Sequence, residues 1–270
     1  MARNPVRILL FGSSLNPPTG ESGHLGVVRY FAKLKTWDEI WILPVYSHMF
    51  SRKRDMLSFD HRVTMAQKCF HPESTNEFTI KICTVEEELF NKKLREGGDP
   101  ASIRVGTFDV ITHLQNSNPN ACFGFLMGTD TYRDLCSGKW RKHKELMQML
   151  EFEVVQRPGE CPVDGKAEGF TEPKKVQKHA AIAELRDVSS SAVRAMIKKE
   201  DLRKAVTPEV AEYILQNHLY GFGQADQSKR RSEGWAPLSP ALLKAILIDA
   251  CVLSVLYVVT QQLWPSYMSS

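Results

Sequence analysis

Short apolar runs that alternate with amphipathic stretches constrain the fold of this chain more than any other feature. Most of these runs end at glycine, proline or a charged residue, which is typical of buried strands that lead into loops. Between the first two runs, apolar residues recur at helical spacing from His24 onwards. The expected strands are residues 7–11, 39–43, 78–83, 121–127 and 151–155, and the expected helices are residues 24–35, 60–70, 107–115, 189–199 and 208–217.

Strands that alternate with helices predict an α/β fold, in which a Rossmann-like parallel sheet carries helices on both faces. Ligands of such sheets bind beyond the carboxyl ends of the strands. Ser13, Asp130 and Arg157 each follow an apolar run closely. We therefore expect these three side chains to line one crevice.

Composition divides the chain into three segments. Residues 1–222 form the α/β domain, residues 223–240 a polar linker, and residues 241–270 an apolar helical tail. The apolar part of the tail is long enough to span a bilayer, but Asp249 makes its insertion energetically marginal. Three interpretations stay open: a membrane anchor, a helix packed on the domain or at a subunit contact, and an artefactual C-terminus. In the first two, we expect the α/β domain to face the cytoplasm, and a nuclear location also stays open.

Charge and cysteine usage exclude several classes of protein. The net charge of +4 is too small to predict nucleic-acid binding, although pockets that hold phosphates would suit it. The six cysteines include no CxxC pair, so a zinc site of the usual spacing is not expected. Five of them lie in or beside apolar or helical runs, which indicates free thiols in a reducing compartment. The N-terminal apolar run, residues 8–11, is too short for the core of a signal peptide.

The first motif that can carry chemistry follows the first strand. Gly12, Ser13 and Ser14 form a turn, and a loop through Thr19 leads to a helix that opens at His24. Main-chain N–H groups of such a turn can hold a phosphate. A histidine at this place can donate hydrogen bonds to phosphoryl oxygens as charge builds on them. The simpler interpretation is a loop histidine that caps the helix.

The second motif reads Val188-Ser-Ser-Ser-Ala-Val-Arg194 and places three serines, Ser189, Ser190 and Ser191, at a helix start. Hydroxyl donors, the helix dipole and the guanidinium fork of Arg194 together suit a phosphate. The simpler interpretation is a serine N-cap with a solvated arginine.

Two further motifs complete the set. Gly128 and Asp130 follow the strand at residues 121–127, where a carboxylate can accept hydrogen bonds from ribose hydroxyls. Trp140 offers a flat face to an aromatic ring, unless it belongs to the core. The basic loop around Lys53 can meet a phosphate or remain a charged loop in solvent.

These motifs occur in an order that resembles the nicotinamide/nicotinate mononucleotide adenylyltransferases, a family of the nucleotidylyltransferase superfamily. The resemblance spans about residues 6–222. It rests on Gly12-Ser-Ser-Leu-Asn-Pro-Pro-Thr19 with Gly23-His24, Pro44-Val45 with Lys53-Arg54, His61-Arg-Val-Thr-Met-Ala66, Gly128-Thr-Asp130 with Trp140, Arg157, the stretch 188–194 and the closing stretch 206–220.

The resemblance implies transfer of the adenylyl group of ATP to nicotinamide or nicotinate mononucleotide, which yields the dinucleotide and pyrophosphate. The attacking 5′-phosphate is already an anion, so the enzyme works by positioning and charge stabilisation. Mg²⁺ is expected to accompany ATP, and a homo-oligomer is expected. The resemblance assigns catalysis to His24 and Arg194, ATP binding to Gly12, Ser13, Ser14, Thr19, Gly128, Asp130, Ser189, Ser190, Ser191 and Arg194, and mononucleotide binding to Lys53, Trp140 and Arg157.

Two departures from the family pattern matter. Thr19 lies farther from His24 than in the family's Thr-x-x-His pattern, so Glu21 competes with Thr19 for the first position of that tetrad. The segment that begins at Cys83 lacks the tryptophan of animal members, which leaves the choice between nicotinamide and nicotinate open.

Two alternative functions remain. A nucleotidylyltransferase of the same fold with another acceptor would share His24 and the serine motif, although Trp140 argues against it. An inactive nucleotide-binding or chaperone-like homologue would bind ATP without releasing pyrophosphate.

Overall fold

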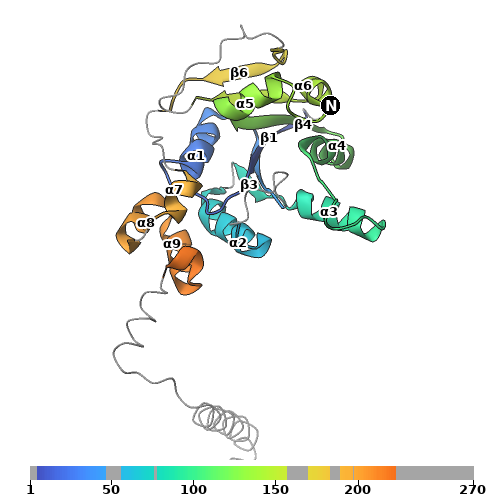
Figure 1. The fold of residues 1–270 in the computed structure, drawn as a ribbon. Coiled ribbons are helices and arrows are strands. Elements are labelled where there is room, and N and C mark those ends of the chain that lie inside the picture. The colour runs from blue at the N-terminus through green and yellow to red at the C-terminus, as the bar shows by residue number, and fades with distance from the viewer. Residues whose placement is uncertain are drawn as a thin grey trace, which may run out of the picture. The chain divides into compact units, whose positions relative to one another are not determined.

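Six parallel strands form the centre of the fold in the computed structural model (Figure 1). The structure describes residues 5–46, 56–75, 78–156, 170–182, 189–196 and 198–222. The strand order is β3-β2-β1-β4-β5-β6, and every neighbouring pair is parallel. The expected Rossmann-like parallel sheet is thereby confirmed. The strands are β1 (Val6–Ser13), β2 (Glu39–Pro44), β3 (Thr79–Ile82), β4 (Ala121–Gly128), β5 (Glu151–Val155) and β6 (Val176–His179).

Side chains alternate across the sheet and supply two hydrophobic cores, one on each face. In β1, Leu9 belongs to one core, and Ile8 and Leu10 belong to the other. The core that contains Leu9 is built with α1 (His24–Leu34), α2 (Phe59–Phe70), α7 (Ser190–Arg194), α8 (Lys199–Ala205) and α9 (Pro208–Gln216). The opposite core is built with α3 (Val85–Arg95), α4 (Thr107–Ser117), α5 (Thr129–Cys136) and α6 (His143–Met149).

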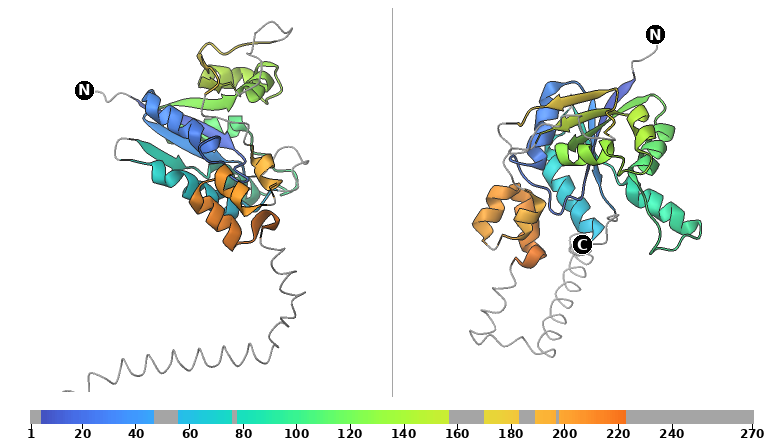
Figure 2. Two further views of the ribbon diagram at one scale, coloured as in Figure 1. Left: turned by 90° about the vertical axis from the view of Figure 1, so that its left-hand side faces the viewer. Right: turned by 45° about the horizontal axis from the view of Figure 1, so that its top comes forward.

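The last helices of the domain return to the N-terminal half of the sheet. Figure 2 shows α9, in orange, beside α2, and α8 packs against α9. Thr207 begins α9 as the N-cap, since its hydroxyl accepts from the Val210 N–H, and Pro208 occupies the first turn as expected. The 3₁₀ turn η2 (Leu219–Gly221) closes this segment, and a second 3₁₀ turn, η1 (His71–Glu73), follows α2.

The expectation of one helix over residues 189–199 is wrong, because two helices occupy this region. α7 ends at Arg194, and α8 begins at Lys199. Val193 is fully buried, and Arg194 bonds to a distant loop. These tertiary contacts fix a short helix where local propensity favours a longer one. Four more elements, β6, α3, α5 and α6, have no counterpart among the expected ones.

The strand order reverses between β1 and β4, which places a crevice at the carboxyl ends of these two strands. Ser13 is the last residue of β1, and Asp130 lies in the first turn of α5, directly after β4. Two of the three side chains expected around one crevice therefore lie at the same edge of the sheet. Arg157 lies outside the described residues.

Several expectations cannot be compared with the structure, because the linker 223–240 and the tail 241–270 also lie outside the described residues. In the described part of the chain, no helix is long and apolar enough to cross a membrane. Four cysteines fall in this part and all are free thiols: Cys69, Cys83 and Cys136 are buried, whereas Cys122 is exposed.

Candidate active site

His24, the first residue of α1, is held from both sides by the loop that precedes it. Its Nε2 lies 2.9 Å from Ser13 Oγ at the end of β1. Its Nδ1 lies 2.6 Å from Thr19 Oγ1 and accepts from the Thr19 main-chain N–H at 3.1 Å. The His24 main-chain N–H donates back to Thr19 Oγ1 at 2.9 Å. Thr19 thus acts as a second anchor for the ring and for the start of the helix.

These bonds decide where the imidazole carries its proton. A main-chain N–H can only donate, so Nδ1 of His24 must offer its lone pair to Thr19. In the neutral ring, the proton therefore resides on Nε2, which faces Ser13 at the carboxyl end of β1. The Nε2–H group consequently donates to Ser13 Oγ, at the end of the sheet where a ligand of this fold binds.

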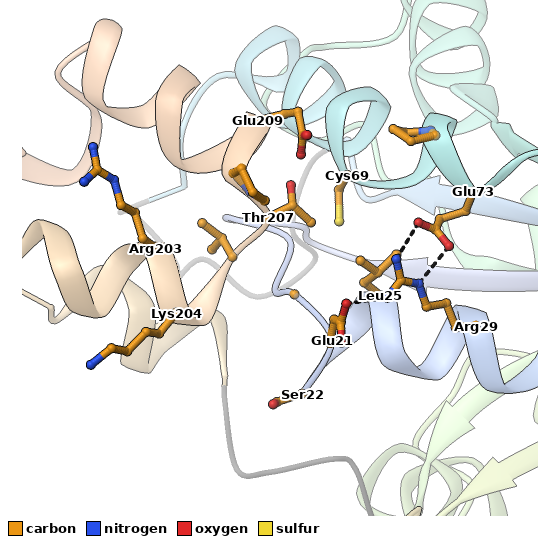
Figure 3. A pocket seen from close by; sticks show the side chains of 14 residues that line it. Glu21, Ser22, Leu25, Arg29, Cys69, Glu73, Arg203, Lys204, Thr207 and Glu209 are labelled. Carbon is orange, nitrogen blue, oxygen red and sulfur yellow. Dashed lines mark hydrogen bonds and ion pairs between the residues drawn. The ribbon is translucent and has the colours of Figure 1, made fainter.

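Thr19, rather than Glu21, fills the position next to His24. The Thr19 side chain is completely buried against the imidazole. The carboxylate of Glu21 turns away and pairs with Arg29, which also pairs with Glu73 of η1, the turn that follows α2 (Figure 3). The longer spacing before His24 is therefore absorbed by residues 20–23, and the contact of the threonine with the histidine is kept.

Residues 20–22 also form part of the wall of a cavity of about 500 Å³. Figure 3 shows Arg29 between Glu21 and Glu73 on one side, with Arg203 and Lys204 on the other. Glu21 lines this cavity, but none of the described residues that the resemblance assigns to catalysis or substrate binding does. The cavity is therefore separate from Ser13 and Thr19, the residues that bond to His24.

The serine motif, which lies near the other end of the domain's sequence, bonds to the loop that precedes His24. Ser190 Oγ donates to the carbonyl of Pro17 at 2.8 Å. Arg194 donates from Nη1 to the carbonyl of Asn16 at 2.7 Å and from Nη2 to Ser191 Oγ at 3.2 Å. Among the described residues, these bonds engage two of the five N–H donors of the guanidinium. The structure thus brings the first two sequence motifs together.

Ser189 fits the simpler interpretation of its motif. Its hydroxyl accepts from the Ala192 N–H at 3.1 Å and forms the N-cap of α7. Arg194 does not fit the simpler interpretation of a solvated arginine. Its side chain is only partly exposed and bonds to main-chain and side-chain oxygens.

Phe125 of β4 contacts both the end of β1 and Trp140, which lies between α5 and α6. Trp140 packs edge-on against Phe125 with ring centroids 6.0 Å apart. A Cβ at Gly12 would lie 3.3 Å from the tip of the Phe125 ring, so glycine allows this close approach. Trp140 is half-buried, with one part on the core and one part open to solvent. Asp130 is exposed beside the turn at Gly128. Lys53, like Arg157, lies outside the described residues.

Arg62 is a site residue that sequence patterns do not reveal. It is 1% exposed, and its guanidinium donates to main-chain carbonyls at the ends of β1 and β2 and ahead of α2. Burial lowers its pKa. Bonds to main-chain carbonyls leave no spacing or composition signal, although Arg62 falls inside the quoted stretch 61–66. The acceptors are Ser14 at 2.9 Å, Val45 at 2.6 Å, Tyr46 at 3.2 Å and Leu57 at 3.0 Å.

Glu86 braces the same region from α3. Its carboxylate accepts from the Tyr46 main-chain N–H at 2.8 Å. Burial raises its pKa to about 7, against the opposing effects of that hydrogen bond and of Arg62. Tyr46 is therefore held through its N–H by Glu86 and through its carbonyl by Arg62.

Comparisons with known proteins agree with this geometry. The family model described as "Cytidylyltransferase-like" matches residues 10–196. A nicotinate-nucleotide adenylyltransferase of Bacillus subtilis is 27% identical over 215 residues, which cover 79% of this chain and 98% of the relative. A probable nicotinate-nucleotide adenylyltransferase of Oceanobacillus iheyensis is 27% identical over 220 residues, or 80% of this chain and 97% of the relative.

A solved structure shares the fold. Nicotinic acid mononucleotide adenylyltransferase of Plasmodium falciparum, complexed with NaAD, superimposes with a TM-score of 0.61 at 20% identity. The match covers 81% of this chain and 99% of that one. Its complex with APC gives a TM-score of 0.60 with the same coverage and identity.

Proposed function

Because the chain belongs to the cytidylyltransferase-like family, we propose that it transfers the adenylyl group of ATP to a pyridine mononucleotide and thereby serves NAD biosynthesis. One observation carries the proposal. The loop 13–19 bonds at both ends to His24 and in its middle to Ser190 and Arg194. Three kinds of phosphate-binding donor thus meet at the carboxyl end of the sheet.

The mechanism follows from the side chains around that loop. The 5′-phosphate of the mononucleotide attacks the α-phosphorus of ATP in line, and the bond to the β-phosphate breaks. We assign His24 Nε2–H to the α-phosphate, where negative charge increases in the transition state. Thr19 keeps the proton on Nε2 through its bonds to Nδ1 and so acts through His24. No side chain has to remove a proton, because the nucleophile is already an anion.

Ser190 and Arg194 are assigned to the departing pyrophosphate. The guanidinium can present two parallel N–H donors to phosphate oxygens, which a lysine cannot do. Gly12, Ser13 and Ser14 would border the α-phosphate, and Gly128 and Asp130 the nucleotide ribose. Trp140 would stack on the pyridine ring with its exposed part, while Lys53 and Arg157 are retained as candidates for the mononucleotide.

Magnesium is proposed to arrive with ATP. Within the described ranges, no group of three metal-ligating side chains lies together, so phosphate oxygens and water would supply most of its ligands. When bound, the metal would neutralise part of the charge on the leaving pyrophosphate. The chain's own part in this step is the guanidinium of Arg194, which does not depend on the metal for its charge.

The test is an assay of the purified full-length protein with ATP, Mg²⁺ and either nicotinate or nicotinamide mononucleotide. We expect equal amounts of dinucleotide and pyrophosphate. The names of the relatives favour nicotinate mononucleotide as the better acceptor. Parallel reactions with CTP and with other phosphate acceptors test a different specificity within the family. ATP binding without pyrophosphate release would contradict the proposal.

A further inference from the structure

Asn16 is the residue on which three separate elements converge. It lies in the loop between β1 and His24 and is 3% exposed. Its carbonyl accepts from Arg194 of α7. Its side-chain Oδ1 accepts from the Tyr220 hydroxyl at 2.7 Å and from the Leu57 N–H at 3.3 Å. Buried polar atoms of this kind are costly to leave without partners, so each bond helps to fix the loop.

The loop needs such support because its own backbone is strained. Leu15, next to Asn16, has a φ of 49° in the left-handed region, although it is not glycine. That conformation is unfavourable for an L-residue and persists only when surrounding contacts hold it. Leu15 is completely buried, and Asn16 supplies the neighbouring polar contacts.

The backbone of Tyr220 is also held in the left-handed region, which indicates that the contact of its hydroxyl with Asn16 matters to the fold. It lies in η2 with a φ of 55°, and His218 before it has a φ of 52°. Strain of this kind at two nearby residues points to a requirement for the side chain at that place. Burial raises the pKa of Tyr220 above its ordinary value, so the hydroxyl stays protonated and acts as the donor to Asn16.

We propose that Tyr220 is a positioning residue for the transfer reaction. By donating to Asn16 Oδ1, it holds the loop 13–19 in its working geometry. This loop in turn bonds to His24, Ser190 and Arg194. Its described hydrogen bond goes to Asn16 rather than to a residue assigned to substrate. Its effect therefore passes through Asn16, whose carbonyl receives Arg194 and whose neighbour Pro17 receives Ser190. The kinetic part of this inference rests on the proposed function.

Tyr220→Phe removes only the hydroxyl, and Tyr213→Phe is the matched control. The Tyr213 hydroxyl also makes one hydrogen bond to another element, to His61 Nδ1 of α2 at 2.9 Å, but not to the loop. We expect Tyr220→Phe to lower kcat roughly three- to tenfold, the effect of one lost buried hydrogen bond. KM values should change less, and Tyr213→Phe should retain the kcat of the wild type. In an Asn16→Ala background, the effect of Tyr220→Phe on kcat should disappear.

A second readout does not depend on activity. In full-length protein with ¹⁵N-labelled histidine, the ring signals of His24, identified by their loss in His24→Ala, report the bonds to Thr19 and Ser13. We expect these signals to shift in Tyr220→Phe and to stay in place in Tyr213→Phe. If both variants lower the melting temperature alike and leave kcat and the His24 signals unchanged, Tyr220 has a merely structural role and the inference is wrong. If the wild type forms no dinucleotide, the proposed function fails, and the His24 spectra alone decide the role of Tyr220.

Discussion

His24 is oriented by its neighbours before any substrate arrives. Thr19 is buried completely and bonds to both the ring and the main chain of His24. The ring is thereby fixed in one tautomer, with its Nε2–H directed at Ser13. Preorganised donors of this kind contribute to catalysis because they need not rearrange as charge develops.

The first prediction concerns this donor. His24→Ala should lower kcat by about 10²–10³, the usual effect of removing one preorganised donor. Thr19→Val keeps the shape of the side chain but removes the hydroxyl, so a smaller loss is expected. Steady-state kinetics and thermal melting measure both effects. A His24→Ala enzyme within threefold of wild-type kcat would contradict the assignment.

Glu86 gives the domain a predicted pH dependence of stability. Its ordinary pKa is 4.5, and burial raises it to about 7 in the fold. The folded state therefore favours the protonated carboxyl, and stability from this group is lost as pH rises from about 4.5 through 7. Glu86→Gln should be increasingly stabilised relative to wild type over this range, by about 1–3 kcal/mol at pH 8.

Urea unfolding at pH 5 and pH 8 measures this difference. Glu88→Gln, on the exposed side of the same helix, is the control. A difference between Glu86→Gln and wild type that is the same at both pH values would show that Glu86 does not titrate in this range.

At the scale of elements, the strands were predictable and several contacts between elements were not. β1, β2 and β4 are buried apolar runs, which any sheet of this class must contain. β6 is a four-residue edge strand with two exposed residues, so it lacks that signal. The break between α7 and α8 depends on Arg194 and Asn16, which lie far apart in the sequence. The roles of Arg62 and Tyr220 likewise depend on acceptors in distant loops.

The packing of β4 against Trp37, which precedes β2, allows a sharp prediction. A Cβ at Gly124 would lie 2.2 Å from the Trp37 indole, which is 2% exposed and donates to Glu153 at 2.9 Å. Gly124→Ala should therefore destabilise the domain by about 1–3 kcal/mol or more through overpacking.

Gly106→Ser is the control for this change. At Gly106 the nearest heavy atom would be 3.7 Å from an added Cβ, and serine is a favoured N-cap for α4. Thermal melting should show a large loss for Gly124→Ala alone. Equal melting temperatures for the two variants would mean that Trp37 can move aside.

At the scale of the whole molecule, the two motifs assigned to phosphate come from opposite ends of the domain's sequence and meet in the fold. The sequence alone predicted the fold class and the motifs, because both depend on local patterns. A crevice at the carboxyl ends of the strands was also expected, but the pairing of β1 with β4 that forms it depends on strand order, which local patterns do not specify. Ligand binding at that crevice should therefore stabilise the domain as a unit.

A non-hydrolysable ATP analogue with Mg²⁺ should raise the melting temperature. At 100 times Kd the stabilisation is about 2.7 kcal/mol, or about 5–10 °C for a domain of this size. His24→Ala should keep this shift, because His24 is assigned to the transition state. Arg194→Lys should reduce it, because the guanidinium is assigned to the ground-state phosphates as well. A full shift in Arg194→Lys would remove Arg194 from the ATP site.

The bond between Tyr220 and Asn16 also determines when the site can form during synthesis of the chain. Asn16 leaves the ribosome early, but its partner follows only after about 200 further residues, roughly 10–40 s later at ordinary rates of synthesis. For about the first half of that interval β1 also lacks β4, its neighbour in the finished sheet. A chain that ends before Tyr220 can therefore orient His24 through Ser13 and Thr19. It still lacks the contact that fixes the loop for nucleotide binding.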